Sequence, residues 1–309
     1  MLKYKNMRKR SILLVFLGIF LVPVTGYAQN SHLFLLSAKR GHLKQVKQQL
    51  ADGVPVNIPN SESGSTALIL AAHRKHTEVV EVLLAHPEID INAANRYGYT
   101  ALHAAIDNHG SGEEIIKKLL AREVIEVNAQ NNDGQTALML SCAAQEGKQA
   151  QLLLEHPATD VNMQDSAGNS ALMYAAYKIN ENEERISYSL GRYYQNPFAL
   201  LRGYGNLDAL NALLARPEIN INFQNSDGFT ALMLAAYSDN IKAVELLMSR
   251  KDVNIYLTNK DGKTALDLAR EKKYRVVQRL ILNAGMTEEE ALAQEQQSRQ
   301  NIQKQSRKS

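Results

Sequence analysis

Residues 228–236 read Gly-Phe-Thr-Ala-Leu-Met-Leu-Ala-Ala, and the chain contains six versions of this motif. The Thr or Ser of each copy stands at positions 66, 100, 136, 170, 230 and 264, so the intervals are 34, 36, 34, 60 and 34 residues. A regular interval of this size is typical of stacked repeat proteins, in which each unit buries its apolar face against its neighbour. The motif therefore predicts a repeat array.

Each copy predicts two helices joined by a short turn. The Thr or Ser suits the N-cap of a first helix, and an apolar stripe such as Val79, Val80, Leu83 and Leu84 marks the second. Asp-Gly pairs such as residues 227–228 supply the positive φ of a tight hairpin. Asparagines in register close the units, and we expect each to bond to the backbone of its own loop: Asn57, Asn92, Asn128, Asn162, Asn222 and Asn254.

This pattern resembles the ankyrin repeat, whose motif is Gly-x-Thr-Pro-Leu-His-x-Ala-Ala followed by a second helix and a closing Val-Asn. All six copies here have Ala in place of the Pro, and only His103 keeps the His. The resemblance implies an all-α ankyrin-repeat solenoid of helix-turn-helix units with short β-hairpin loops. It implies about seven repeats within residues 29–285, including a degenerate N-terminal cap, and a structural role for His103 within its own turn.

Both ends of the chain differ from the repeats. Residues 1–28 combine a basic start with an apolar run and a small-residue site at 26–28, which predicts a cleaved export signal, with an uncleaved membrane anchor as the alternative. We therefore expect a periplasmic or secreted protein. Residues 286–309 are rich in Gln, Glu, Lys and Arg, which favours a disordered tail.

One repeat is interrupted, because the interval from Ser170 to Thr230 is 60 residues. The extra residues are placed at 178–203, between the two helices of that repeat, and the first helix is expected to run on into them. This insertion and its flanks are rich in Tyr and Arg, the residue types enriched at binding hot spots. Packing of the aromatic residues against the next repeat is the alternative interpretation.

Candidate partner-binding residues come from a hairpin tip and from this insertion. They are Arg96, Tyr97, Tyr99, Tyr177, Arg185, Tyr188, Arg192, Tyr193, Tyr194 and Phe198. In ankyrin-repeat proteins the hairpin tips and first-helix faces form the concave binding surface, so the resemblance places the first three on such a surface.

The sequence contains no pattern of catalytic or cofactor-binding residues. Histidine pairs such as His73 with His76 lack the third and fourth ligands that a zinc site needs, and Cys142 stands where other copies have Ala. The net charge is +3, and it becomes −2 without the five basic residues of the predicted signal, which argues against a nucleic-acid partner. We therefore expect no metal, no cofactor and no enzymatic activity.

Taken together, the residues predict a monomeric, exported scaffold that binds a protein partner. Two alternatives remain open, namely a module that binds a small molecule or metal, and a companion or inhibitor of an exported enzyme. Apart from the possible uncleaved anchor, no membrane contact is expected.

Overall fold

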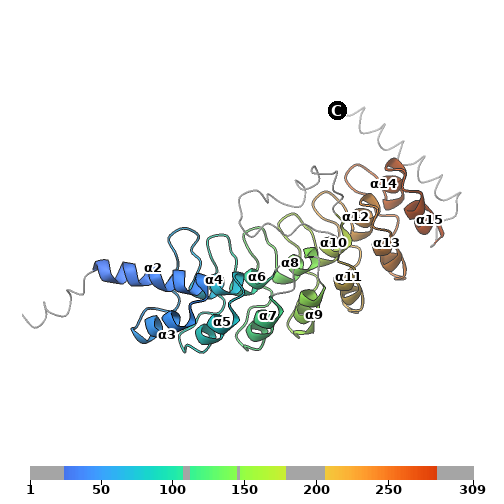
Figure 1. Ribbon diagram of the computed structural model, residues 1–309. Coiled ribbons are helices and arrows are strands. Elements are labelled where there is room, and N and C mark those ends of the chain that lie inside the picture. The colour runs from blue at the N-terminus through green and yellow to red at the C-terminus, as the bar shows by residue number, and fades with distance from the viewer. Residues whose placement is uncertain (1–23, 107–111, 145–146, 179–205, 284–309) are drawn as a thin grey trace, which may run out of the picture. The chain divides into compact units, whose positions relative to one another are not determined.

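The computed structural model describes residues 24–106, 112–144, 147–178 and 206–283 (Figure 1). These residues form 14 helices, which make seven helix pairs, and they contain no β-strand, although Gln164 and Ser170 form an isolated β-bridge. Contacts divide the chain into two compact units, residues 1–90 and 91–309. The predicted all-α repeat architecture is therefore confirmed, and each unit is described by itself.

Unit 1 contains two helix pairs and unit 2 contains five. The pairs of unit 1 are α2 (Val24–Arg40) with α3 (Leu43–Ala51), and α4 (Ala67–His73) with α5 (Thr77–Leu84). Those of unit 2 are α6 (Ala101–Ala105) with α7 (Glu113–Leu120), α8 (Ala137–Ala143) with α9 (Lys148–Glu155), α10 (Ala171–Ala176) with α11 (Leu207–Leu214), α12 (Ala231–Tyr237) with α13 (Ile241–Met248), and α14 (Ala265–Glu271) with α15 (Arg275–Asn283).

The helices of each unit lie in two rows. In unit 2 the first helices α6, α8, α10, α12 and α14 contact one another in order, and so do the second helices (Figure 1). Alanines such as Ala71 and Ala235 are fully buried where the first helices meet, because only a small side chain fits between closely packed helices. The predicted stripe of α5, Val79, Val80, Leu83 and Leu84, is buried as well.

The predicted N-caps are present in the structure. The side chains of Thr66, Thr100, Thr136, Thr230 and Thr264 each accept a hydrogen bond from the backbone N–H three residues further on. Ser170 occupies the same place in the interrupted repeat, but its side chain makes no cap hydrogen bond.

Each pair has two ends with different connections. At one end a short turn joins its two helices, and in four pairs this turn contains a residue with positive φ: Gly41 (74°), Lys75 (62°), Asp239 (52°) and Lys273 (61°). We call this end the turn edge. A longer loop with a hairpin leaves the other end for the next pair, and we call that end the hairpin edge.

The predicted export signal falls mostly outside the described residues. Helix α2 begins at Val24, so the predicted cleavage site at 26–28 lies within its first turns. Among the described residues no helix has the length and apolar character needed to cross a membrane. Signal cleavage and export remain predictions, and the predicted tail at 286–309 lies outside the described residues.

Candidate protein-binding surface

The hairpin edge of unit 2 is built from five loops with the same geometry. Each begins with a buried Asn or Asp whose Oδ1 accepts the backbone N–H groups two and four residues further on, at 2.8–3.0 Å: Asn95, Asn131, Asp165, Asn225 and Asn259. Three residues later a glycine takes a φ between 73° and 80°. The carboxamide or carboxylate thereby holds the loop in shape, and the positive φ of the glycine allows the chain to turn.

Backbone hydrogen bonds join each tip to the next one. Asn132 N donates to Tyr97 O (3.0 Å), Ser166 N to Asp133 O (2.9 Å), Ser226 N to Ala167 O (2.8 Å) and Lys260 N to Asp227 O (3.0 Å). An added Cβ on Gly98 or Gly134 would lie 2.6 Å from the backbone nitrogen of the next tip. The tips of unit 2 are therefore fixed relative to one another before any partner binds.

Glutamine side chains add a second set of links at the base of the tips. Gln130, Gln164 and Gln224 each donate from Nε2 to the glycine carbonyl of their own loop and to a carbonyl in the next repeat. Each glutamine thus holds its own hairpin in shape and also joins it to its neighbour.

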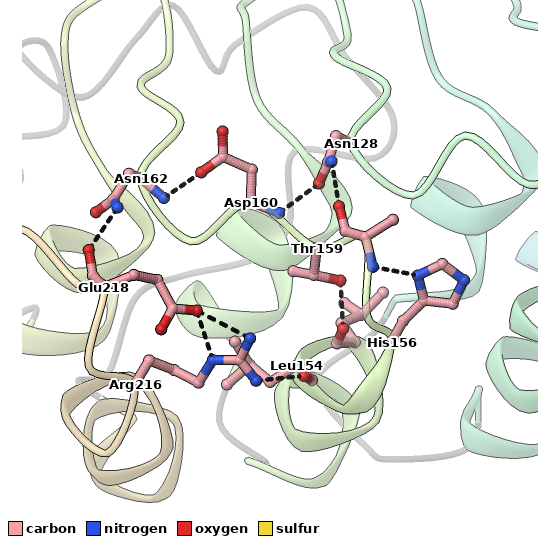
Figure 2. Close-up of polar contacts among 10 residues, drawn as sticks. Asn128, Leu154, His156, Thr159, Asp160, Asn162, Arg216 and Glu218 are labelled. Carbon is pink, nitrogen blue, oxygen red and sulfur yellow. Dashed lines mark hydrogen bonds and ion pairs between the residues drawn. The ribbon is translucent and has the colours of Figure 1, made fainter.

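The closing asparagines make a third set of links (Figure 2). Asn128 Nδ2 donates to Ala158 O (2.6 Å) while its Oδ1 accepts from Asp160 N (2.9 Å), and Asn162 bonds to Glu218 O and Asn220 N in the same way. The expectation that these side chains bond within their own loop is therefore wrong, because they bridge to the next repeat. Asn57, Asn92 and Asn222 also bridge, and only Asn254 bonds within its own loop.

Two arginines each link their own repeat to the preceding repeat. Arg216 Nη1 donates to Leu154 O at the end of α9 (3.2 Å), and its guanidinium pairs with Glu218 at 2.9 Å (Figure 2). Arg250 repeats the arrangement with Leu214 O at the end of α11 and with Asp252. Each arginine satisfies a carbonyl that the helix end leaves without an intrahelical partner.

Two of the predicted partner-binding residues lie at one tip of this edge. The side chain of Arg96 is exposed and that of Tyr97 is half-buried. Their carbonyls accept hydrogen bonds from Asn132 Nδ2 (2.8 Å) and Asn132 N (3.0 Å) respectively. The backbone that carries both side chains is therefore held in place.

Two other predicted residues are corrected by the structure, because their side chains are buried. Tyr99 is 2% exposed and its ring makes an edge contact with His103 at 5.6 Å between centroids, and Tyr177 is 5% exposed. Both belong to the core rather than to an accessible surface. Arg185, Tyr188, Arg192, Tyr193, Tyr194 and Phe198 lie outside the described residues and stay predictions.

His103 has the structural role that the family resemblance implied. Its Nδ1 accepts from Thr100 N (3.3 Å), which closes a capping box, and its Nε2 donates to Gln135 O in the next repeat (3.1 Å). Burial lowers the pKa of His103 to about 4, so the ring is neutral at physiological pH. The neutral tautomer matches this pair of partners.

A buried polar network, which the sequence did not reveal, lies at the base of the hairpins of the interrupted repeat. Tyr174 Oη donates to Asp165 Oδ2 (2.6 Å) and accepts from Gln135 Nε2 (2.8 Å). Asn169 Nδ2 donates to the same Asp165 oxygen (3.1 Å), and Asn225 Nδ2 donates to Asn169 Oδ1 (2.9 Å). The available signal was Tyr174 itself, which stands where the other copies have Leu or Ala.

The ends of the insertion are held as in an uninterrupted repeat. Asn206 N donates to Ala175 O at 2.9 Å, as Asn240 N donates to Ala235 O at 2.9 Å in the next repeat. This register places the inserted residues at 179–204, one residue later than predicted. Helix α10 ends at Ala176 and Tyr177 is extended, so the expectation that the first helix runs on is wrong at that point.

Neither a reactive thiol nor a metal site is found in the described parts of the chain. Burial raises the pKa of Cys142 to about 12, so its thiol stays protonated and inert. Within residues 24–106, 112–144, 147–178 and 206–283, no three His, Cys, Asp or Glu residues lie close enough to hold a metal ion.

The helix pairs and the hairpins that join them identify the chain as a stacked repeat protein. The linked hairpin tips form the surface described above. The family model for ankyrin repeats matches residues 34–131, 108–188 and 198–289, which together span most of the chain. The chain belongs to the ankyrin-repeat family.

Single relatives resemble only part of this chain or share only its fold. Osteoclast-stimulating factor 1 of Xenopus laevis is 43% identical over 56 residues, which are 18% of this chain and 26% of that relative's length. The crystal structure of EF0377, an ankyrin repeat protein, has a TM-score of 0.56 at 23% identity and covers 74% of this chain and 97% of its own.

Proposed function

We propose that this chain is a non-enzymatic, exported scaffold that binds a protein partner through the hairpin edge of unit 2, around Arg96 and Tyr97. Ankyrin repeats generally mediate protein–protein interactions, and their fold is typically a non-enzymatic scaffold. The family therefore supports the class of function, while the partner and its contact site are the proposal.

The observation that carries the proposal is a fixed backbone beneath side chains that a partner can reach. The tips are linked by backbone, glutamine and asparagine hydrogen bonds, while the side chain of Arg96 is exposed and that of Tyr97 is half-buried. Ordering a loop or a long side chain on binding costs free energy, and a surface that is already ordered avoids much of that cost. Tyr and Arg are also the residue types that contribute most at binding hot spots.

Site-specific cross-linking tests the contact. A photoreactive phenylalanine analogue replaces Tyr97 in one variant and Val124 in a matched control, which is 71% exposed and lies in a link between repeats. We expect position 97 to cross-link a defined protein and position 124 to give none. Equal cross-linking at both positions would reject the hairpin edge as the contact.

A deletion separates the hairpin edge from the predicted insertion surface. Removing residues 179–204 leaves Ala-Ala-Tyr-Lys-Gly-Asn, which matches the ordinary turn Ala-Ala-Tyr-Ser-Asp-Asn at 235–240. Unchanged cross-linking from position 97 would assign the contact to the hairpin edge. Loss of the partner from a variant that still folds would assign it to the insertion.

Export is supported by the basic start, apolar run and small-residue site of residues 1–28. N-terminal sequencing of the protein recovered from the periplasm or medium tests it, and we expect a mature chain that begins at residue 29. A full-length chain retained in the cytoplasm would contradict export.

A further inference from the structure

The charges of unit 1 are separated between its two edges. The turn edge, residues 37–46 and 71–80, carries five cations and one carboxylate, Glu78: Lys39, Arg40, Lys44, Arg74 and Lys75. The hairpin edge, residues 47–66 and 81–90, carries five carboxylates and one lysine: Asp52, Glu62, Glu81, Glu88, Asp90 and Lys47. The described part of unit 1, residues 24–90, carries equal numbers of basic and acidic side chains, yet one of its edges is strongly basic.

The two basic turns are locked together by His76. Its Nε2 donates to Lys39 O at 3.1 Å, and its ring packs so closely on Gly41 that an added Cβ there would lie 2.5 Å from Nδ1. Lys39 and Arg40 on one turn are thereby held at a fixed distance from Arg74 and Lys75 on the other. The backbones that carry these cations are therefore held together, so that the positive charges stay clustered on one edge.

Three cations of this surface are not neutralised by other described residues of the chain. Lys39, Arg40 and Arg74 are exposed, and none of them forms an ion pair with the described residues. The dipoles of paired helices oppose one another at a shared edge, so they give little compensation. Burial, together with the nearby charges of Arg74, Lys75 and Lys39, lowers the pKa of His73 to about 4, as expected where the local potential is positive.

Lys75 is kept in a strained conformation. Its φ is 62°, and the equivalent residue of the preceding turn is Gly41, with a φ of 74°. A residue with a Cβ in this region costs roughly 1–2 kcal/mol, a cost that glycine avoids.

We propose that the turn edge of unit 1 binds an acidic segment of a protein, at a surface distinct from the hairpin edge of unit 2. Adjacent packed helices lie about 8–10 Å apart. An extended peptide rises about 3.3 Å per residue and points alternate side chains to the same face, so carboxylates two or four residues apart can face both turns together. A membrane fits less well, because Leu33 is the one large apolar residue exposed in the described part of unit 1, and membrane-surface segments combine basic with apolar side chains.

Fluorescence anisotropy with a labelled octaglutamate peptide tests this proposal on the full chain. Charge reversal by Lys39→Glu with Arg74→Glu should weaken binding about tenfold or more, and added salt should weaken it further, because the contact is electrostatic. The matched control, Lys148→Glu with Lys251→Glu, changes the net charge equally at exposed positions of unit 2 and should change binding by less than about twofold.

A third variant separates binding from folding. Lys75→Gly removes one charge and relieves the strained φ, so it should stabilise the fold and still weaken octaglutamate binding about two- to threefold. Equal losses in the two double variants would overturn the proposal, and so would octaglutamate binding no better than octaglutamine. Binding to phosphatidylglycerol vesicles without binding to octaglutamate would overturn it in favour of a lipid surface.

Discussion

The two edges of the repeats differ in what they connect. Every loop on the hairpin edge of unit 2 bonds to the next loop through backbone, and most also through glutamine or asparagine side chains. The turn edge is linked differently: each turn is closed by a local bond such as Asn240 N to Ala235 O, and single side chains join neighbouring turns, as His76 Nε2 does to Lys39 O and Asn240 Nδ2 to Ala176 O. Changes at the hairpin edge are therefore transmitted between repeats, whereas the turn edge accommodates strained residues and a 26-residue insertion.

The largest effect is expected from a glycine on the hairpin edge. Gly134→Ala places a Cβ 2.6 Å from Ser166 N at a φ of 76°. Left-handed strain costs roughly 1–2 kcal/mol, and displacement of the neighbouring tip adds to it, so we expect a loss of about 3 kcal/mol. Urea unfolding followed by circular dichroism measures the change.

Gly262→Ala is the matched control for steric displacement. Its φ is 73°, but an added Cβ would meet no atom within 4 Å. It should therefore cost only the strain of about 1–2 kcal/mol. Equal losses at the two glycines would show that the contact between tips contributes little.

The second effect concerns the pH dependence of the His103 contact. The pKa of His103 is about 4 in the folded protein, against 6.5 for an unperturbed histidine, so between these values the unfolded chain binds more protons. The contribution of His103 to the free energy of unfolding is therefore fully present above pH 6.5. As the pH falls toward 4, the free energy of unfolding decreases by about 3 kcal/mol. Unfolding free energies measured from about pH 7 to pH 4 test this loss.

His103→Gln supplies the comparison, because glutamine does not titrate. The pKa of His73 is lowered to about 4 as well, so the chain and its variant share that contribution, and their difference isolates His103. A pH dependence that is identical in the two proteins would contradict the assigned role of His103.

The third effect tests the buried network of the interrupted repeat. Tyr174→Phe removes the hydroxyl that bonds to Asp165 Oδ2 and Gln135 Nε2, which leaves buried polar groups without that partner. We expect a loss of about 1–3 kcal/mol. Tyr237→Phe keeps the ring contacts with Phe229 and Lys272 and should leave stability unchanged, whereas equal losses would show that the network contributes nothing specific.

Local signals in the sequence predicted the repeated unit well. Thr caps, Asp-Gly turns and apolar stripes each act within a few residues, so the helix pairs and hairpins could be placed from them. The bonds between repeats were not predicted, because the same Asn128 can serve its own loop or the next one, and only the stacking distance decides. Burial of Tyr99 and Tyr177 was also missed, because packing in the folded protein decides which rings are covered, and composition alone does not show it.

The smallest effect belongs to the turn edge and has the opposite sign. Lys75→Gly removes a Cβ from a residue with a φ of 62°, and should stabilise unit 1 by about 1 kcal/mol. Asp239→Gly, with a φ of 52°, should give a similar gain in unit 2. Suppose that both gains are found while Gly134→Ala is strongly destabilising. Strain at the turn edge then stays within its own turn, whereas displacement of a tip at the hairpin edge affects the next repeat. Loss of stability in either turn variant would show that these turns rely on their side chains, and that the two edges differ less than their hydrogen bonds indicate.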